Sequence, residues 1–294
     1  MRLRPAVDGD REAVSALGVT EEIAWFGEPE SSAEEVGEWI DDERALATGV
    51  VAVDDDGRIR AFASPGRKEA IFLADPALAD VLADELLPRL LERRDDLQLM
   101  TFGGDAPRVA AFERHGLRHR RSSFSLVRLE SAGPLPEAEF PDGIDVAPYR
   151  LGEDDEAVHR LIYVDAAWAA VPGHAGRDLD GWREVVRLSG SLSLARRDGR
   201  PVGWVAARLL DSGRGFINTL AVAVDERRRG LGRALLLRAF RDLQAAGAGD
   251  ITLGVEAHNE NALNLYRSVG MEVEREWRIY GVAPGGLEPP TSPL

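Results

Sequence analysis

The chain has 294 residues, of which 44% are hydrophobic and 30% are charged. This length and composition predict a soluble protein of about two domains. The formal net charge of −15 argues against a nucleic-acid partner, because most of the surface would repel phosphates. The absence of cysteine excludes disulfides, thiolate metal ligands and a cysteine nucleophile. We therefore expect a cytoplasmic protein with no metal site, no membrane span and no signal peptide.

The predicted elements occur twice in the same order. Each half contains a helix, then two strands around an Asp-Gly turn, and later a helix followed by glycine. In the first half these segments are 10–17, 51–53 with 59–62, and 105–117. In the second half they are 154–162, 192–195 with 202–206, and 259–271. The repetition predicts domains at 1–129 and 144–283, a linker at 130–143 and a disordered tail at 284–294.

A glycine turn lies between a predicted strand at 216–224 and a predicted helix at 233–246. This helix is expected to stop at Gly247 and to bury an apolar stripe with helical spacing: Leu236, Ala239, Phe240 and Leu243. The sequence of the turn is Arg227-Arg228-Arg229-Gly230-Leu231-Gly232-Arg233. A glycine turn that opens a helix presents unpaired N–H groups and partial positive charge, which suit a phosphate or pyrophosphate. Arginine side chains can hold further phosphate oxygens. Such a turn alone is equally compatible with a purely structural role.

A second motif follows downstream: Asn259, Ala262, Leu265, Tyr266 and Gly270-Met271. Together with Val222, Val224 and the glycine turn, this motif resembles the GNAT superfamily of N-acetyltransferases, in particular its tandem-domain members such as mycothiol synthase. The resemblance implies two α/β domains, each with a mixed, mainly antiparallel central sheet flanked by helices. It also implies that acetyl-CoA is bound by a strand, the turn and the second motif: Leu220, Ala221, Val222, Arg227, Arg228, Arg229, Gly230, Leu231, Gly232, Arg233 and Asn259.

The two halves differ at the positions that carry the motif. Where the second half has the turn, the first half has 77–82, which contains no glycine and includes Asp80. Side chains there would block close backbone approach to a pyrophosphate. Phe112 stands in place of Tyr266 and has no hydroxyl to donate a proton. We interpret the first half as a degenerate domain that has lost cofactor binding.

The resemblance gives Tyr266 the role of the acid that protonates the departing sulfur. A phenol with an ordinary pKa near 10 stays protonated at neutral pH. The backbone N–H of Val222 is the implied group that polarises the thioester carbonyl. In the family the strand carrying Val222 also diverges from the next strand, which leaves room for the thioester.

The base that deprotonates the amine is less well defined. Many family members have a glutamate where this sequence has Phe216. Glu256 is the best candidate because it alternates to the polar face of the following strand, with His258 behind it. A solvated carboxylate at the strand end is an equally good interpretation of Glu256. Asn218 has no proton to lose but can order a water molecule.

The segment after the first helix of the second half is expected to line the acceptor pocket. It contains Tyr163, Trp168, Pro172, His174 and Trp182, with Asp165, Asp178 and Asp180. Aromatic rings and carboxylates suit an amine, but core tryptophans beneath a polar loop explain the pattern equally well.

The sequence therefore favours an N-acetyltransferase, monomeric or homodimeric, that acts on a primary amine of a small molecule or peptide. The alternatives are a mycothiol-synthase-like enzyme that acetylates a cysteinyl pseudodisaccharide, and a CoA-binding regulatory protein without turnover.

Overall fold

The computed structural model describes residues 1–67, 70–93, 96–167, 178–187 and 189–282. Contacts group the chain into two compact units. The N-terminal unit contains Met1–Phe124 and the last strand from Arg275, and the C-terminal unit is Ser125–Glu274. The predicted tail at 284–294 lies outside the described residues.

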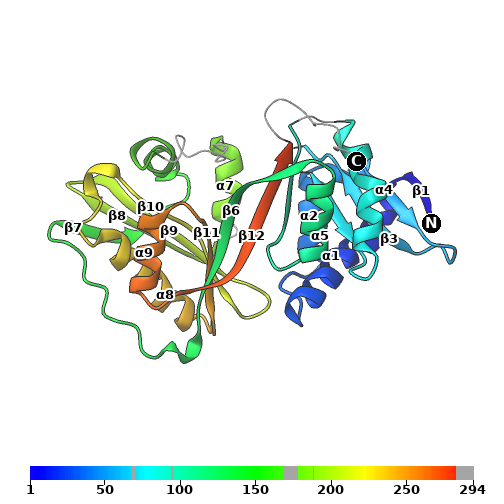
Figure 1. Ribbon diagram of the computed structural model, residues 1–294. Coiled ribbons are helices and arrows are strands. Elements are labelled where there is room, and N and C mark those ends of the chain that lie inside the picture. Colours follow the sequence, from blue (N-terminus) through cyan, green and yellow to red (C-terminus); the bar gives the residue numbers. More distant parts are fainter. Residues whose placement is uncertain (68–69, 94–95, 168–177, 188, 283–294) are drawn as a thin grey trace. The chain divides into compact units, whose positions relative to one another are not determined.

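The N-terminal unit has a four-stranded antiparallel sheet in the order β1-β2-β3-β4 (Figure 1). Its elements are β1 (Arg2–Pro5), η1 (Asp8–Asp10), α1 (Arg11–Phe26), α2 (Ala33–Asp42), α3 (Ala45–Thr48), β2 (Val50–Val53), β3 (Ile59–Ser64), β4 (Ile71–Ala74), α4 (Ala79–Leu91), β5 (Gln98–Phe102) and α5 (Ala106–Arg114). Phe62 and Leu73 pack with residues of α1 and α2, whereas Ala63 and Phe72 pack with residues of α4. Helices therefore cover both faces of this sheet, because successive strand residues point to opposite faces.

The C-terminal unit has a sheet in the order β7-β8-β9-β10-β11. Its elements are β7 (Ile144–Pro148), α6 (Asp155–Arg160), the π-helix η3 (Leu161–Asp165), α7 (Leu179–Arg187), β8 (Ser191–Arg197), β9 (Arg200–Leu209), β10 (Gly215–Val222), η5 (Val224–Glu226), α8 (Leu231–Ala245), β11 (Ile251–Glu256) and α9 (Glu260–Ser268). The recorded pairs from β7 to β10 are antiparallel, and β10 pairs with β11 in parallel. Each unit is thus a mixed, mainly antiparallel sheet flanked by helices, as predicted.

Two long strands contribute residues to both units. They are β6 (Leu117–Arg128), which the short helix η2 (Glu130–Ala132) follows, and β12 (Glu272–Val282). Within the N-terminal unit, β12 pairs antiparallel with β5, from Trp277 opposite Phe102 to Gly281 opposite Gln98. By its contacts, the last strand from Arg275 therefore belongs to the first unit, whereas the predicted ranges 1–129 and 144–283 place it in the second.

Helix α8 packs closely on the sheet of the C-terminal unit. Its predicted apolar stripe is buried: Leu236, Ala239, Phe240 and Leu243. A Cβ on Gly203 of β9 would lie 2.7 Å from Leu235, and one on Gly215 of β10 would lie 2.8 Å from Leu243. Glycine at these two positions lets the helix approach the strands. The helix ends at Ala245, just before Gly247 as predicted.

The predicted linker is bound to the C-terminal unit rather than free. The segment 133–143, green in Figure 1, runs to β7 at the outer edge of the sheet. Arg241 of α8 donates a hydrogen bond to the carbonyl O of Pro136, and Arg197 of β8 donates to that of Asp142. These contacts fix the path of the segment.

Candidate functional site

Strands β10 and β11 separate soon after they begin. Their recorded pairs are Gly215 with Ile251 and Phe216 with Thr252. On the other side of β10, the register with β9 shifts between Ile217 and Thr219, so Asn218 is the extra residue of a β-bulge. A bulge bends a strand and redirects its side chains. The strand divergence implied by the resemblance is therefore present, and it begins next to the bulge.

The end of β10 exposes backbone groups at the edge facing away from β9. The Ala223 N–H donates a hydrogen bond to the carbonyl O of Val202, in the neighbouring strand β9, at 2.9 Å. Adjacent residues of a strand point their backbone groups to opposite edges, so Val222 N–H and C=O point away from β9. The contact of Val222 O with Arg227 Nε, at 3.1 Å, agrees with this direction. The Val222 N–H thus points to the edge of β10 that faces away from β9, and its predicted contact with the thioester carbonyl stays a prediction.

The glycine turn opens α8 without a side-chain cap. Gly230 is the N-cap residue with φ of +87°, and Arg228 has φ of +60°. Two such residues in a short segment turn successive backbone N–H groups toward one side. The first N–H groups of a helix have no intrahelical partner. The turn therefore presents unpaired backbone N–H groups at the start of α8, and its predicted contact with a phosphate stays a prediction.

The turn's arginines differ in their surroundings. Arg229 lies 3.4 Å from the buried carboxylate of Glu226, which Arg197 also contacts at 2.7 Å. Arg227 donates to two backbone carbonyls, those of Val222 and Ala166. Neither Arg228 nor Arg233 forms a recorded hydrogen bond or ion pair with the part of the chain that the structure describes.

Helix α9 brings the second motif beside the turn. A Cβ on Gly232 would lie 3.4 Å from Leu265 of α9 and 3.6 Å from Val222 of β10, so three elements meet at this glycine. Asn259 caps α9, because its side-chain oxygen accepts a hydrogen bond from Ala262 N–H at 3.2 Å. Asn259 thus has a local structural role, and its predicted contact with the cofactor stays a prediction.

Tyr266 follows Leu265 on α9 and is half-buried. Burial raises the pKa of Tyr266 to about 12, above the value near 10 expected from the sequence. Its hydroxyl forms no recorded hydrogen bond within the described residues. The hydroxyl therefore keeps its proton at neutral pH, although it is a weaker acid than a free phenol.

The candidate bases lie at the end of β11. Glu256 is the last residue of this strand and is half-buried, whereas His258 is exposed in the following turn. Phe216, which occupies the position of the usual glutamate, lies beneath the guanidinium of Arg208 at 5.8 Å. The Oδ1 atom of Asn218 is buried and lacks a hydrogen-bond partner among the residues described.

The predicted acceptor segment is partly core. Trp182 is 4% exposed and packs against Tyr149 and Trp204, so the core interpretation is the correct one for this tryptophan. Asp178 accepts from Gly181 N–H at the start of α7, and Asp180 pairs with Arg183. Two other predicted residues, Tyr163 and Asp165, lie on η3. The predicted positions Trp168, Pro172 and His174 are outside the described residues.

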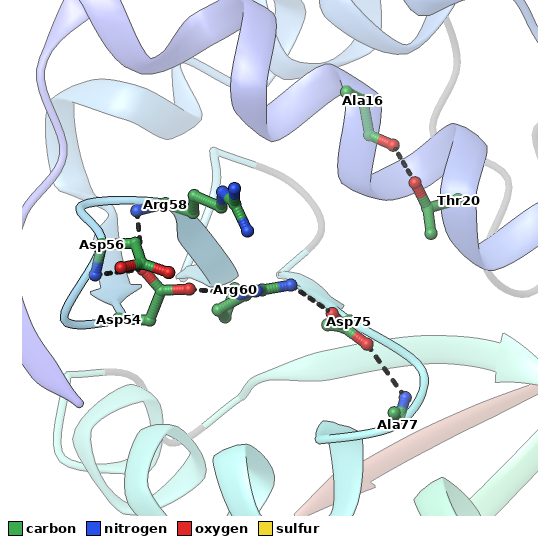
Figure 2. A network of polar contacts seen from close by, with 8 residues as sticks. All are labelled: Ala16, Thr20, Asp54, Asp56, Arg58, Arg60, Asp75 and Ala77. Carbon is green, nitrogen blue, oxygen red and sulfur yellow. Dashed lines mark hydrogen bonds and ion pairs between the residues drawn. The ribbon is translucent and has the colours of Figure 1, made fainter.

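In the N-terminal unit, the turn before the equivalent helix has a different backbone. Helix α4 begins at Ala79 after a turn in which no residue from 75 to 82 has a positive φ. The Asp75 carboxylate accepts from Ala77 N–H at 3.1 Å and pairs with Arg60, which also pairs with Asp54 (Figure 2). This turn therefore lacks the positive-φ residues found before α8, although both helices begin without a side-chain cap.

The gap between β4 and β5 is filled. These strands meet at one parallel bridge, Ala70 with Leu99. Beyond it, the buried carboxylate of Glu21 accepts from Ala74 N–H at 2.6 Å and forms an ion pair with Arg108. Arg108 also donates to Phe72 O at 3.4 Å. The chain's own side chains therefore satisfy the open edge of β4. This pair was not predicted from the sequence.

None of the helices in the described residues is both long and apolar enough to cross a membrane. Nor do three or more histidine and carboxylate side chains in this part of the chain gather as metal ligands.

Comparison with known proteins matches the acetyltransferase (GNAT) family to residues 160–271, within the C-terminal unit. A mycothiol acetyltransferase of Kytococcus sedentarius is 31% identical over 238 residues, which cover 76% of this chain and 78% of that protein. Those of Thermomonospora curvata and Saccharomonospora viridis are 30% and 28% identical. The chain spans just under two thirds of their lengths, 63% and 65%.

Solved structures share the whole fold. A GCN5-related N-acetyltransferase from Sphaerobacter thermophilus has a TM-score of 0.77 at 23% identity, covering 95% of this chain and 94% of that chain. A tandem GNAT protein from the clavulanic acid biosynthesis pathway has a TM-score of 0.69 at 14% identity, covering 95% of this chain and 98% of that chain. The similarity to both is one of fold and extends over both units.

Proposed function

The chain belongs to the GNAT family of acetyltransferases, and we propose that its C-terminal unit transfers an acetyl group from acetyl-CoA to a primary amine of a small molecule or peptide. The observation that carries the proposal is the uncapped start of α8 beside the open edge of β10. The N-terminal unit has lost this function in our proposal, since Glu21 and Arg108 bond to the edge of β4 and the turn before α4 has no glycine.

The residues of the C-terminal unit fit acetyl-CoA. Backbone N–H groups at Leu231, Gly232 and Arg233, with the side chains of Arg228 and Arg233, would hold the pyrophosphate. The open edge of β10 at 220–222 offers backbone hydrogen bonds to an extended amide chain. Acetyl-CoA supplies the activated acetyl thioester for the reaction.

Each catalytic role falls to a separate group of the chain. Val222 N–H stabilises the negative charge that develops on the carbonyl oxygen. The amine nitrogen attacks the carbonyl carbon, so that a C–N bond forms as the C–S bond breaks. Tyr266 donates its proton to the departing sulfur. Its raised pKa keeps that proton in place at neutral pH.

Glu256 is the proposed base that removes the proton from the amine. Its place at the end of β11, after the strand has left β10, supports this assignment. His258 and a water molecule held by Asn218 remain the alternatives.

The relatives named mycothiol acetyltransferase support a second acceptor, the cysteinyl amine of a pseudodisaccharide. We keep it as an alternative because Phe216 replaces the usual carboxylate in this chain.

The test is release of free CoA thiol from acetyl-CoA in the presence of amines. The panel contains amino acids, polyamines, peptides and a cysteinyl pseudodisaccharide, and mass spectrometry identifies the acetylated product. We expect at least one amine to accelerate thiol release, and the variant Gly230→Asp to reduce that acceleration strongly at acetyl-CoA concentrations below saturation. Binding of acetyl-CoA without turnover on any amine would favour the regulatory alternative.

A further inference from the structure

The first arginine of the turn is bound by the protein itself. Nε of Arg227 donates to Val222 O at 3.1 Å, and Nη2 of Arg227 donates to Ala166 O at 2.6 Å. Both acceptors are backbone atoms that secondary structure holds in place. A guanidinium presents its donors in a rigid planar fork, so two such bonds fix the orientation of the whole group.

The two acceptors belong to different parts of the site. Val222 ends β10, and its N–H points to the same edge as the carbonyl that Arg227 holds. Ala166 follows the π-helix η3, and its N–H closes the last turn by donating to Leu161 O at 2.7 Å. η3 carries Tyr163 and Asp165, which the sequence assigns to the acceptor side. Arg227 therefore connects the strand of the acetyl donor to the helix of the acceptor.

The neighbouring arginines provide the contrast. Arg228 and Arg233 form no recorded hydrogen bond or ion pair with residues that the structure describes, so their fork donors are available to a phosphate. Arg227 has committed its Nε and Nη2 donors to carbonyl groups.

We propose that Arg227 is a positioning residue and not a phosphate ligand: it fixes the Val222 edge of β10 relative to η3. The catalytic meaning of this role rests on the proposed function, in which β10 is the strand of the acetyl donor and η3 is the helix of the acceptor. The contact itself is independent of which amine is acetylated.

Two measurements on matched variants test the assignment. Arg227→Lys keeps the charge but loses the planar fork, and Arg227→Gln loses both; Arg228→Gln is the control for a phosphate contact. Hydrogen exchange of the amides of 161–167 is followed in the ligand-free protein. The Kd of acetyl-CoA is measured by calorimetry over a series of salt concentrations.

We expect both Arg227 variants to accelerate exchange in 161–167 by about tenfold, the effect of losing one hydrogen bond to a charged group. Arg228→Gln should leave exchange unchanged but weaken binding and flatten its salt dependence, since a charge pair with phosphate is screened by salt. Arg227→Gln should keep the wild-type salt dependence.

Unchanged exchange in both Arg227 variants would overturn the proposal. So would a salt dependence that Arg227→Gln flattens as strongly as Arg228→Gln. If the protein does not bind acetyl-CoA, the proposed function fails, and the exchange measurement alone decides the role of Arg227.

Discussion

The two units contain the same succession of strand, helix, strand and helix around a pair of diverging strands, but the N-terminal unit fills that divergence with a buried ion pair. In the N-terminal unit, Glu21 accepts from Ala74 N–H and Arg108 donates to Phe72 O at the edge of β4. In the C-terminal unit, Arg227 donates to Val222 O at the corresponding edge of β10, and the turn before α8 has positive φ at Arg228 and Gly230.

The difference shows how a binding unit can become a structural one without losing its fold. Diverging strands leave buried N–H and C=O groups that are costly unless they are paired. A ligand can pair them, or a buried side chain can. Arg108 lies three residues after the capping Asp105, and Ala262 lies three after the capping Asn259. The second unit thus has the small residue Ala262 at the position where the first unit has the long cationic side chain of Arg108.

The largest expected effect tests the hydroxyl that distinguishes the units. Tyr266→Phe should lower kcat by about 10²–10⁴-fold, the typical loss for a general acid, with little change in the Kd of acetyl-CoA. Phe112→Tyr is the matched control and should not alter turnover, because the first unit lacks the glycine turn that would bring acetyl-CoA near this residue. Steady-state kinetics on the best amine measures both. Equal rates for Tyr266→Phe and wild type would show that the sulfur takes its proton from elsewhere.

The next effect tests the side chains that fill the first unit. Arg108→Ala leaves the buried carboxylate of Glu21 without its guanidinium partner, which should lower the free energy of unfolding by about 3–5 kcal/mol. Denaturant titration measures the loss, with the exposed Arg118→Ala as control. Calorimetry on the same variant should still find one acetyl-CoA per chain, because the turn before α4 has no glycine. A second site would mean that the Glu21–Arg108 pair alone excludes the cofactor.

The features predicted from sequence are those with local causes. The stripe on α8 follows from a 3.6-residue period, and the turn follows from glycines next to that stripe. The bulge at Asn218 depends on pairing with β9, which one strand's sequence does not specify. The Glu21–Arg108 contact joins residues far apart in the chain. Its one signal is an arginine on a helix where the other half has Ala262.

A smaller effect is expected from a substitution in the glycine turn before α8. Gly230→Asp should weaken acetyl-CoA binding by about 100-fold, or about 2.7 kcal/mol. An aspartate there strains a backbone with φ of +87° and places negative charge beside the phosphates. Calorimetry gives the Kd. Gly213→Asp, at φ of +79° in a hairpin of the same unit, carries equal strain and should bind normally. Equal affinity in both variants would remove the turn from the site.

The smallest expected effect concerns the base, at a position where the two units have side chains of different chemical character. Glu256 lies three residues before Asn259, and the same position in the first unit is Phe102, which packs against Phe26 with ring centres 5.1 Å apart. If Glu256 takes the amine proton, its protonation must lower the rate at acidic pH. Glu256→Gln should then reduce kcat/KM by at least about tenfold and remove the acidic limb of its pH profile.

The alternative to Glu256 is a water molecule held by the buried Oδ1 of Asn218. In that case Glu256→Gln should be nearly silent and Asn218→Ala should cost more, because the alanine has no acceptor for the water. The midpoint of the acidic limb separates the two routes. An unchanged midpoint in Glu256→Gln rules that carboxylate out as the base. If the acidic limb is lost in Glu256→Gln but kept in Asn218→Ala, Glu256 is the base that takes the amine proton. Its counterpart in the first unit is Phe102, an apolar ring.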